Sequence, residues 1–347
     1  MQLTPEIKAQ LEEQKKQCVF CKIISKELNG KIVFEDDKTI ALLDIYPALK
    51  GHTVFMLKEH YPMPAYVSGE EFKHKFGLIP ALSKAVKEGM VMTGMNVFIA
   101  IGGAAGQQSY HFLVHLLPRE NGDGFFNFLF DKNKKKLDED GVKILQQNMP
   151  IMMKNHFGRH PANWHAGEGT VPSFLTSIYE SSTVIYEDEK VLCVIPEKSL
   201  AKGHLVISSK DEEKFIENLS QEDSAHLFFT ASFASTAVFE GLKAHATNII
   251  LKSGDSDDNP DGRLAVHIIP RWQDDGLDLL WKPKQSSYNL DEVASKIKDK
   301  TWKIKYQKEV KEIKKENIFV KPEVIRIGGK RNSVEDEIKR AIDKLRE

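Results

Sequence analysis

The stretch His115-Leu-Leu-Pro-Arg119 recurs 152 residues later as His267-Ile-Ile-Pro-Arg271. Two further pairs share this offset: Gly51-His-Thr-Val54 with Gly203-His-Leu-Val206, and Phe34-Glu-Asp-Asp-Lys38 with Tyr186-Glu-Asp-Glu-Lys190. Because a single offset relates all three pairs, no insertion or deletion separates them. The sequence therefore predicts one structural unit that occurs twice in tandem.

Short apolar runs bounded by turn residues favour β-strands. We expect strands at 31–34, 39–44, 52–57, 96–100 and 109–117 in the first copy, and at 248–252 and 263–269 in the second. Ser68-Gly-Glu-Glu71 is a capping box that begins a helix expected to reach about Gly94, and Ser220-Gln-Glu-Asp223 has the same place in the second copy. The predicted fold class is α+β, with two units that each place one long helix on an antiparallel sheet.

The repeat also divides the chain. We expect an N-terminal helix over 1–16, a first unit over 17–134, a helical linker over 135–168, a second unit over 169–285 and a basic helical extension over 286–347. The linker helix is expected from about Leu137 to His156, and a last helix from Val334 to Arg346.

The composition is that of a globular protein. The chain has 347 residues, of which 41% are hydrophobic and 29% charged, and its net charge of −1 gives no global basic excess that would indicate a nucleic-acid binder. The absence of an apolar run of about eighteen residues and of a secretory signal predicts a cytoplasmic protein without a membrane span. Three cysteines, an odd number, argue against a disulfide framework.

Several motifs together resemble the histidine-triad (HIT) nucleotide hydrolases and transferases. They are Cys18-x-x-Cys21, Leu43-Asp44-Ile-x-Pro47, Gly51-His-Thr, Lys58-x-His60, Ala105-Gly106-Gln107 and His115-x-x-Pro118-Arg119. The resemblance covers 18–130 well and 170–285 mainly through the shared offset. Galactose-1-phosphate uridylyltransferases also hold two such units, but their His-Pro-His motif is absent here. Because HIT proteins pair as homodimers whose sheets join edge to edge, the resemblance implies an internal pseudo-dimer.

The resemblance also implies a strand with three alternating histidines, the middle of which attacks the α-phosphorus of a nucleotide. That role needs a nitrogen lone pair. The corresponding stretches here are His111-Phe-Leu113-Val-His115 and Arg263-Leu-Ala265-Val-His267, so Leu113 and Ala265 occupy the nucleophile positions. The sequence therefore predicts that neither copy forms a nucleotidyl-histidine.

A structural zinc in the first unit is implied by the same resemblance. Its ligands would be Cys18, Cys21, His60 and His111, a closed set of the kind that holds structural Zn²⁺. The four positions at the offset of 152 read Thr170, Ser173, Glu212 and Arg263, so the second copy has lost the whole set. The alternative is that the two cysteines are ordinary thiols.

A nucleotide site in the first unit is implied by Asp44, which would accept hydrogen bonds from ribose, and by Gly106, Gln107 and His115, which would face phosphate. The alternative is that these residues only build turns and strands. Ala100 stands where the family has an asparagine, which weakens the case for a nucleotide site. In the second copy Pro196 and Asp258-Asn259 replace Asp44 and Gly106-Gln107, and an acidic loop should repel phosphate. His52 and His204 are expected to be structural, and Arg119 and Arg271 to contact a carboxylate or the chain terminus.

Three functions remain open. The first is a degenerate tandem HIT protein that binds a purine nucleotide weakly in the first unit, or serves as a scaffold. The second is an active nucleotide hydrolase or nucleotidyltransferase that uses another nucleophile, such as a linker histidine, or water near His115. The third is a docking protein whose basic residues 296–347 bind an acidic protein or RNA. The alternative for these residues is a solvent-exposed helical face of mixed charge without a partner.

Overall fold

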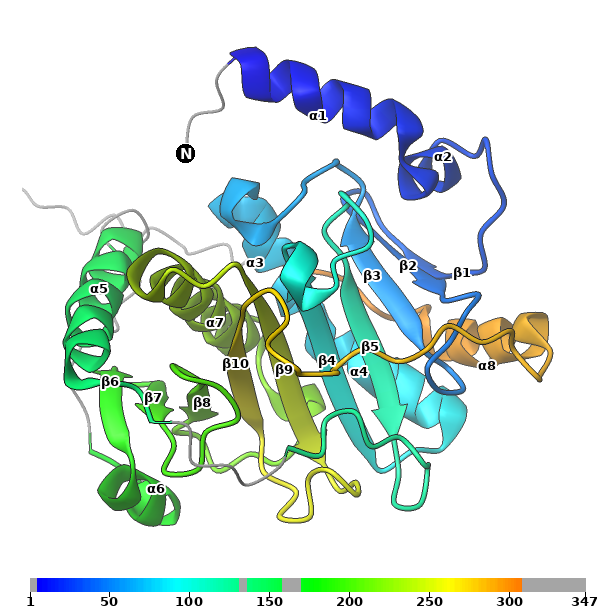
Figure 1. Cartoon of the computed structure of the whole chain (residues 1–347). Coiled ribbons are helices and arrows are strands. Elements are labelled where there is room, and N and C mark those ends of the chain that lie inside the picture. Colours follow the sequence, from blue (N-terminus) through cyan, green and yellow to red (C-terminus); the bar gives the residue numbers. More distant parts are fainter. Residues whose placement is uncertain (1–4, 131–135, 158–169, 308–347) are drawn as a thin grey trace, which may run out of the picture. The chain divides into compact units, whose positions relative to one another are not determined.

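One continuous antiparallel sheet of ten strands organises the computed structural model, which describes residues 5–130, 136–157 and 170–307 (Figure 1). The first half supplies β1 (Ile32–Glu35), β2 (Thr39–Leu43), β3 (Thr53–Leu57), β4 (Gly94–Ile101) and β5 (Val114–Arg119). The second half supplies β6 (Thr183–Glu187), β7 (Val191–Ile195), β8 (Leu205–Ser209), β9 (Ala246–Gly254) and β10 (Ala265–Arg271). The strand order is β1-β2-β3-β5-β4-β9-β10-β8-β7-β6, so the predicted α+β class and the joining of the two units through their sheets are confirmed.

The two halves meet where β4 pairs with β9 over eight residue pairs, from Gly94 opposite Gly254 to Ile101 opposite Thr247. At the middle of this ladder Phe98 lies opposite Ile250, its own counterpart at the offset of 152. A strand residue pairs with its counterpart only where a two-fold axis passes. The register therefore gives the chain the pseudo-two-fold symmetry of a dimer built within one polypeptide.

Helices α3 (Gly69–Gly77), α4 (Ile79–Met90) and α7 (Gln221–Leu242) lie behind the sheet in the view of Figure 1. Both predicted capping boxes are present, because the hydroxyls of Ser68 and Ser220 accept hydrogen bonds from the backbone N–H groups of Glu71 and Asp223. The expectation of a single helix from 68 to about 94 is wrong. The helix breaks at Leu78, since Pro80 lacks the N–H that an unbroken helix would use, and it ends at Met90.

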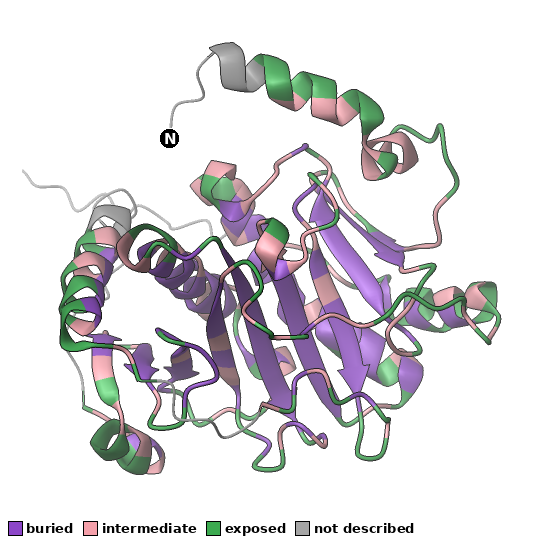
Figure 2. Ribbon diagram, viewed as in Figure 1, coloured by how far each residue is buried: buried purple, intermediate pink, exposed green. Residues whose placement is uncertain are grey.

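The main hydrophobic core is shared by both halves. Phe72 of α3 stacks on Phe229 of α7 with ring centroids 4.0 Å apart, and Phe76 stacks on Phe228 at 4.6 Å. The strands of the central sheet are almost wholly buried, as Figure 2 shows. The two halves therefore do not have separate cores, and the unit boundaries proposed from the sequence stay predictions.

Five further helices complete the described part of the chain. They are α1 (Pro5–Gln17), α2 (Val19–Ile24), α5 (Glu139–Phe157), α6 (Thr176–Ser181) and α8 (Leu290–Thr301), with short 3-10 turns at Pro64–Tyr66, Gly103–Ala105, Ser173–Leu175 and Ile216–Asn218. The linker helix predicted over 137–156 corresponds to α5, which packs on α7 and β6. None of the helices within the described residues is long and apolar enough to cross a membrane.

The start of the basic extension is part of the fold. Val293 and Ile297 of α8 are buried against the first half, and the Thr301 hydroxyl donates a hydrogen bond to the Val33 carbonyl. The compact unit continues to Tyr306. The predicted helix over 334–346 lies outside the described residues, and an acidic protein or RNA partner for 296–347 stays a prediction.

A buried ion-pair network crosses the junction between the halves. The Arg119 guanidinium, fully buried, donates to Asp258 Oδ1 at 2.7 Å and to Asp123 Oδ2 at 2.6 Å. Arg271 donates to Asp275 in the same way at 2.7 Å, so the expectation that both arginines contact carboxylates is confirmed. The expectation that Asp258 belongs to a phosphate-repelling loop is wrong, because its carboxylate is buried against Arg119 of the other half.

Replacing Asp258 by alanine should destabilise the protein by about 3 kcal/mol, since the buried guanidinium loses one of its two carboxylates. Chemical denaturation measures this difference. The matched control is Asp261→Ala, which removes an exposed carboxylate from the same loop and should cost at most about 0.5 kcal/mol. Equal effects of the two substitutions would contradict the assignment of Asp258 to the junction.

Candidate metal centre and adjoining pocket

Two cysteines and two histidines converge beside the sheet. Cys18 precedes α2 and Cys21 lies one turn later, so both thiols share one side of this short helix. His60 follows β3 and His111 precedes β5. The ligand atoms of all four lie within 4.8 Å of one another, so the set predicted from the sequence is brought together and could hold a metal ion.

The distances within this cluster suit tetrahedral coordination. Cys21 Sγ lies 3.3 Å from His60 Nδ1 and 3.6 Å from His111 Nδ1, and Cys18 Sγ lies 3.7 Å from His111 Nδ1. Metal bonds of about 2.3 Å to sulfur and about 2.0 Å to nitrogen, at a tetrahedral angle, place two such donors about 3.5 Å apart. The observed separations bracket that value.

Neighbouring groups determine the orientation of the His111 ring and the protonation of the Cys21 thiol. His111 Nε2 donates to the Leu57 carbonyl at 2.8 Å, which leaves the Nδ1 lone pair directed at both thiols. Burial and the neighbouring Cys18 raise the pKa of the Cys21 thiol to about 12, so a cation is required to hold the thiolate. Across the described part of the chain, no comparable His/Cys group occurs in the second half.

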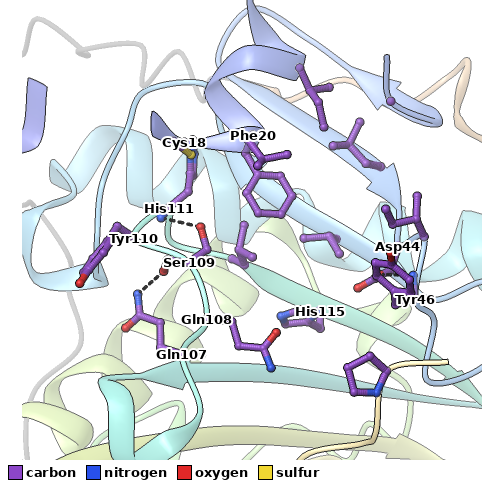
Figure 3. A pocket seen from close by; sticks show the side chains of 18 of the residues that line it. Cys18, Phe20, Asp44, Tyr46, Gln107, Gln108, Ser109, Tyr110, His111 and His115 are labelled. Carbon is purple, nitrogen blue, oxygen red and sulfur yellow. Dashed lines mark hydrogen bonds between the residues drawn. The ribbon is translucent and has the colours of Figure 1, made fainter. Parts of the chain in front are cut away.

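A pocket of about 860 Å³ adjoins the cluster and shares Cys18 and His111 with it. Figure 3 shows His115 between Gln108 on one side and Asp44 with Tyr46 on the other. Asp44 Oδ1 accepts a hydrogen bond from the Tyr46 N–H at 2.8 Å, and its carboxylate remains partly exposed to the pocket. Three predicted nucleotide-site residues, Asp44, Gly106 and Gln107, therefore line one cavity together with His115.

His115 is held by a chain of hydrogen bonds with a fixed direction. The Ala48 N–H donates to His52 Nδ1 at 3.2 Å, so the proton of the neutral His52 ring lies on Nε2. That Nε2 donates to His115 Nδ1 at 3.0 Å. Burial lowers the pKa of His115 to about 3, so its ring is neutral and carries its proton on Nε2. His115 thus has no free nitrogen lone pair.

The second half repeats this chain of hydrogen bonds. The Leu200 N–H donates to His204 Nδ1 at 3.1 Å, and His204 Nε2 lies 3.1 Å from His267 Nδ1. The structural role expected for His52 and His204 is confirmed, but their pairing with His115 and His267 was not foreseen. The retention of both histidines of each pair in both copies was the sequence signal for it.

The segment that should carry the nucleophile is not a strand at that point. The expectation of a strand over 109–117 is wrong before Val114, because the Phe112 N–H donates to the Tyr61 carbonyl instead of joining the ladder. The buried Lys75 donates to the Phe112 carbonyl at 3.1 Å, and burial lowers the pKa of its ammonium well below the usual value. Leu113 packs against an apolar cluster that contains Leu42 and Val54.

The glycine loop predicted to face phosphate has internal partners. The N–H groups of Gly106 and Gln107 donate to the carbonyls of Gly103 and Gly102. The Gln107 side chain accepts from the Gly102 N–H and donates to the Pro62 and Ser109 carbonyls. Gly106 has a φ of +83°, and a Cβ placed on it would lie 2.0 Å from Leu280 Cδ1. Leu280 of the other half therefore lies directly against this loop.

Each half covers the histidine pair of the other. The segment after β10 crosses the face of the sheet over β4 and β5 (Figure 1), and the ring of Trp281 lies 5.3 Å from that of His115 and 5.0 Å from that of His52. In return the Phe130 ring of the first half lies 5.1 Å from that of His267. No sequence pattern pointed to Trp281, because its contacts come from outside the repeat motifs.

The first half of the chain is similar to HIT proteins. Residues 25–122 match the family model of the HIT domain. The chain is 36% identical over 138 residues to an uncharacterised HIT-like protein of Borreliella burgdorferi, covering 39% of this chain and 96% of that protein. It is 35% identical over 109 residues to the Protein hit of Bacillus subtilis, covering 31% of this chain and 75% of that protein.

A solved structure that matches both halves shows the same arrangement of units. It is an ADP-glucose phosphorylase from Arabidopsis thaliana, with a TM-score of 0.50 and 13% sequence identity, and the match covers 84% of this chain and 90% of that one. At this identity the likeness is one of fold, and it supports the arrangement of two units along one sheet.

The histidine pairs should make stability depend on pH. Burial lowers the pKa values of His52, His115 and His204 to about 3 and that of His267 well below its usual value, whereas unfolded histidines titrate near about 6.5. The unfolded state therefore binds more protons, and stability is lost as the pH falls from about 6.5 towards 3. Denaturation at pH 7, 5.5 and 4.5 measures this loss, and nitrogen-15 NMR at pH 6 should find the His115 proton on Nε2. A proton on Nδ1 would contradict the assigned hydrogen-bond direction.

Proposed function

This chain belongs to the HIT superfamily, and from that premise we propose that its first unit binds a ligand of the purine-nucleotide class without forming a nucleotidyl-histidine. The observation that carries the proposal is the pocket in which Asp44 and His115 face one cavity while Leu113 stands at the nucleophile position. Asp44 offers a carboxylate to the ribose hydroxyls. The aromatic rings of Phe20, Tyr46 and Trp281 line the same cavity and offer surfaces for a planar base.

The hydrogen bonds of His115 favour this proposal over an active hydrolase. A nucleophile or a general base needs a nitrogen lone pair directed at its target. His115 Nδ1 already accepts from His52, and its Nε2 carries the proton, so the ring can only donate a hydrogen bond to a ligand. Ala265 stands at the corresponding position of the second half, where Phe130 covers His267.

We further propose that the metal of the first unit is a structural zinc held by Cys18, Cys21, His60 and His111. Two thiolates and two imidazoles complete a tetrahedral shell, so the ion would link chain segments and leave no open position for a substrate. It would tie α2, the turn after β3 and the segment before β5 into one wall of the pocket. Cys18 and His111 belong to both the cluster and the pocket, so loss of the metal should also loosen the ligand site.

Purified protein should contain about one zinc per chain, and the double variant Cys18→Ser, Cys21→Ser should contain well under one, since serine is a poor zinc ligand. Elemental analysis measures this directly. The control is Cys193→Ser, which changes the cysteine that lies outside the cluster and should leave the zinc content unchanged. A wild-type protein purified without chelators and free of zinc would refute the assignment.

Calorimetric titration should detect binding of purine nucleosides or nucleotides, and Asp44→Asn should weaken it about tenfold by removing a charged hydrogen-bond acceptor. The control Asp37→Asn changes an exposed carboxylate away from the pocket and should leave the affinity unchanged.

The same preparations, incubated with α-labelled ATP, should show no acid-labile covalent label. Nucleotide turnover that His115→Ala abolishes would overturn the proposal that the site is not catalytic. The absence of purine binding to the zinc-loaded protein would overturn the proposal that it is a nucleotide site.

A further inference from the structure

We propose that the pocket of the first unit selects an uncharged nucleoside and disfavours its 5′-phosphate. This inference rests on the proposed function, because it names the form of the purine ligand that the site accepts. Three properties of the lining favour a neutral ligand: its apolar floor, its occupied glycine loop and its charge balance.

The floor of the pocket is apolar where a phosphate would lie beside His115. Leu113 packs with Leu42 and Val54, and all three line the cavity. Ala100, also in the lining, offers no side-chain donor. A phosphate moved from water onto this apolar floor loses hydration that Leu42, Val54 and Leu113 cannot restore, and an ion without partners pays several kcal/mol for that loss.

The glycine loop has few donors left for an anion. The backbone N–H groups of Gly106 and Gln107 and the whole Gln107 amide are used within the loop and its neighbours. Leu280 covers Gly106 so closely that not even a methyl group would fit there. A backbone loop binds phosphate through free N–H groups that the phosphate can approach closely. In this loop the N–H groups of Gly106 and Gln107 already have acceptors, and Leu280 lies against Gly106.

The charge balance of the pocket also disfavours a phosphate. The one lysine or arginine in the described lining is Lys31, and its ammonium lies 2.5 Å from Asp291 Oδ1. The carboxylate of Asp44 is therefore the only charge in that lining without a close ion-pair partner of opposite charge, since the neighbouring His52 is neutral. A ligand that brings about two negative charges meets repulsion in this pocket.

The remaining polar groups suit a neutral nucleoside. Asp44 can accept hydrogen bonds from a vicinal diol, and His115 Nε2 can donate one to a neutral hydroxyl. Aromatic and aliphatic side chains supply most of the other surface, and about 860 Å³ exceeds what a nucleoside needs. A neutral donor and a single carboxylate fit a 5′-hydroxyl and a diol better than they fit a dianion.

Calorimetric titration of the full-length, zinc-loaded protein with adenosine, AMP, guanosine and GMP tests the inference. For the purine that binds, the Kd of the monophosphate should be about tenfold higher than that of the nucleoside. A monophosphate that binds as tightly as its nucleoside, or more tightly, would overturn the inference and leave the proposed function standing. If none of the four binds, the proposed function itself fails, so the two failures are distinguishable.

A variant of the chain tests whether the charge of the pocket, and not only its shape, disfavours the monophosphate. Asp291→Asn releases Lys31 from its partner and gives the pocket a free cation, so the ratio of the monophosphate Kd to the nucleoside Kd should fall two- to threefold while the nucleoside Kd stays constant. Asp299→Asn removes an exposed carboxylate from the same helix and should leave the ratio unchanged. An unchanged ratio in Asp291→Asn would overturn the electrostatic basis of the selectivity.

Discussion

The pairing of β4 with β9 is the constraint on which the rest of the molecule depends. It places Phe98 opposite Ile250, and that register sets the pseudo-two-fold axis, the stacking of Phe72 on Phe229 and the approach of Arg119 to Asp258. A shift of this ladder by one residue would turn its inward side chains outward. Without the pairing, each half would expose a long central edge strand, which is a hazard for aggregation. Covalent linkage of the halves makes the pairing independent of protein concentration.

The two units are not equivalent once they are joined. Trp281 and Leu280 of the second half close the pocket of the first, and Phe130 of the first half covers the histidine pair of the second. The second half has meanwhile replaced the metal ligands and Asp44, so it supplies a wall of the pocket in the first half and has no comparable metal group within its described residues. This division of roles gives a physical reason to retain a duplicated fold after the residues of one site have been replaced.

The repeat and the motif positions could be predicted from the sequence, because they depend on the spacing of residues along the chain. Contacts between segments that lie far apart in the sequence could not be predicted. The offset of 152 predicted two tandem units, and the resemblance to HIT proteins predicted that their sheets join. The same resemblance predicted the four ligands of the Cys/His cluster that the structure brings together. Asp258 was misjudged because counting the charges of its loop ignores Arg119, which reaches it from the other half. The sequence marks the helix break at Pro80, because proline cannot donate the backbone N–H that a continuous helix needs. Trp281 had no local signal, since the rings that it contacts lie more than 150 residues away in sequence.

Leu113, which stands at the position of the nucleophile in the resemblance to HIT proteins, is matched to its surroundings. A histidine at Leu113 would lie against Leu42 and Val54, where its ring N–H would need a hydrogen-bond partner that the described apolar cluster does not supply. The segment that would carry this histidine is not paired in the sheet, because the Phe112 N–H donates to the Tyr61 carbonyl and the Phe112 carbonyl accepts from Lys75. Leu280 lies against the glycine loop that would face phosphate. A nucleophilic histidine at position 113 would therefore require changes in the floor, the backbone and the opposite half together, whereas the proposed binding of a neutral ligand requires none of them.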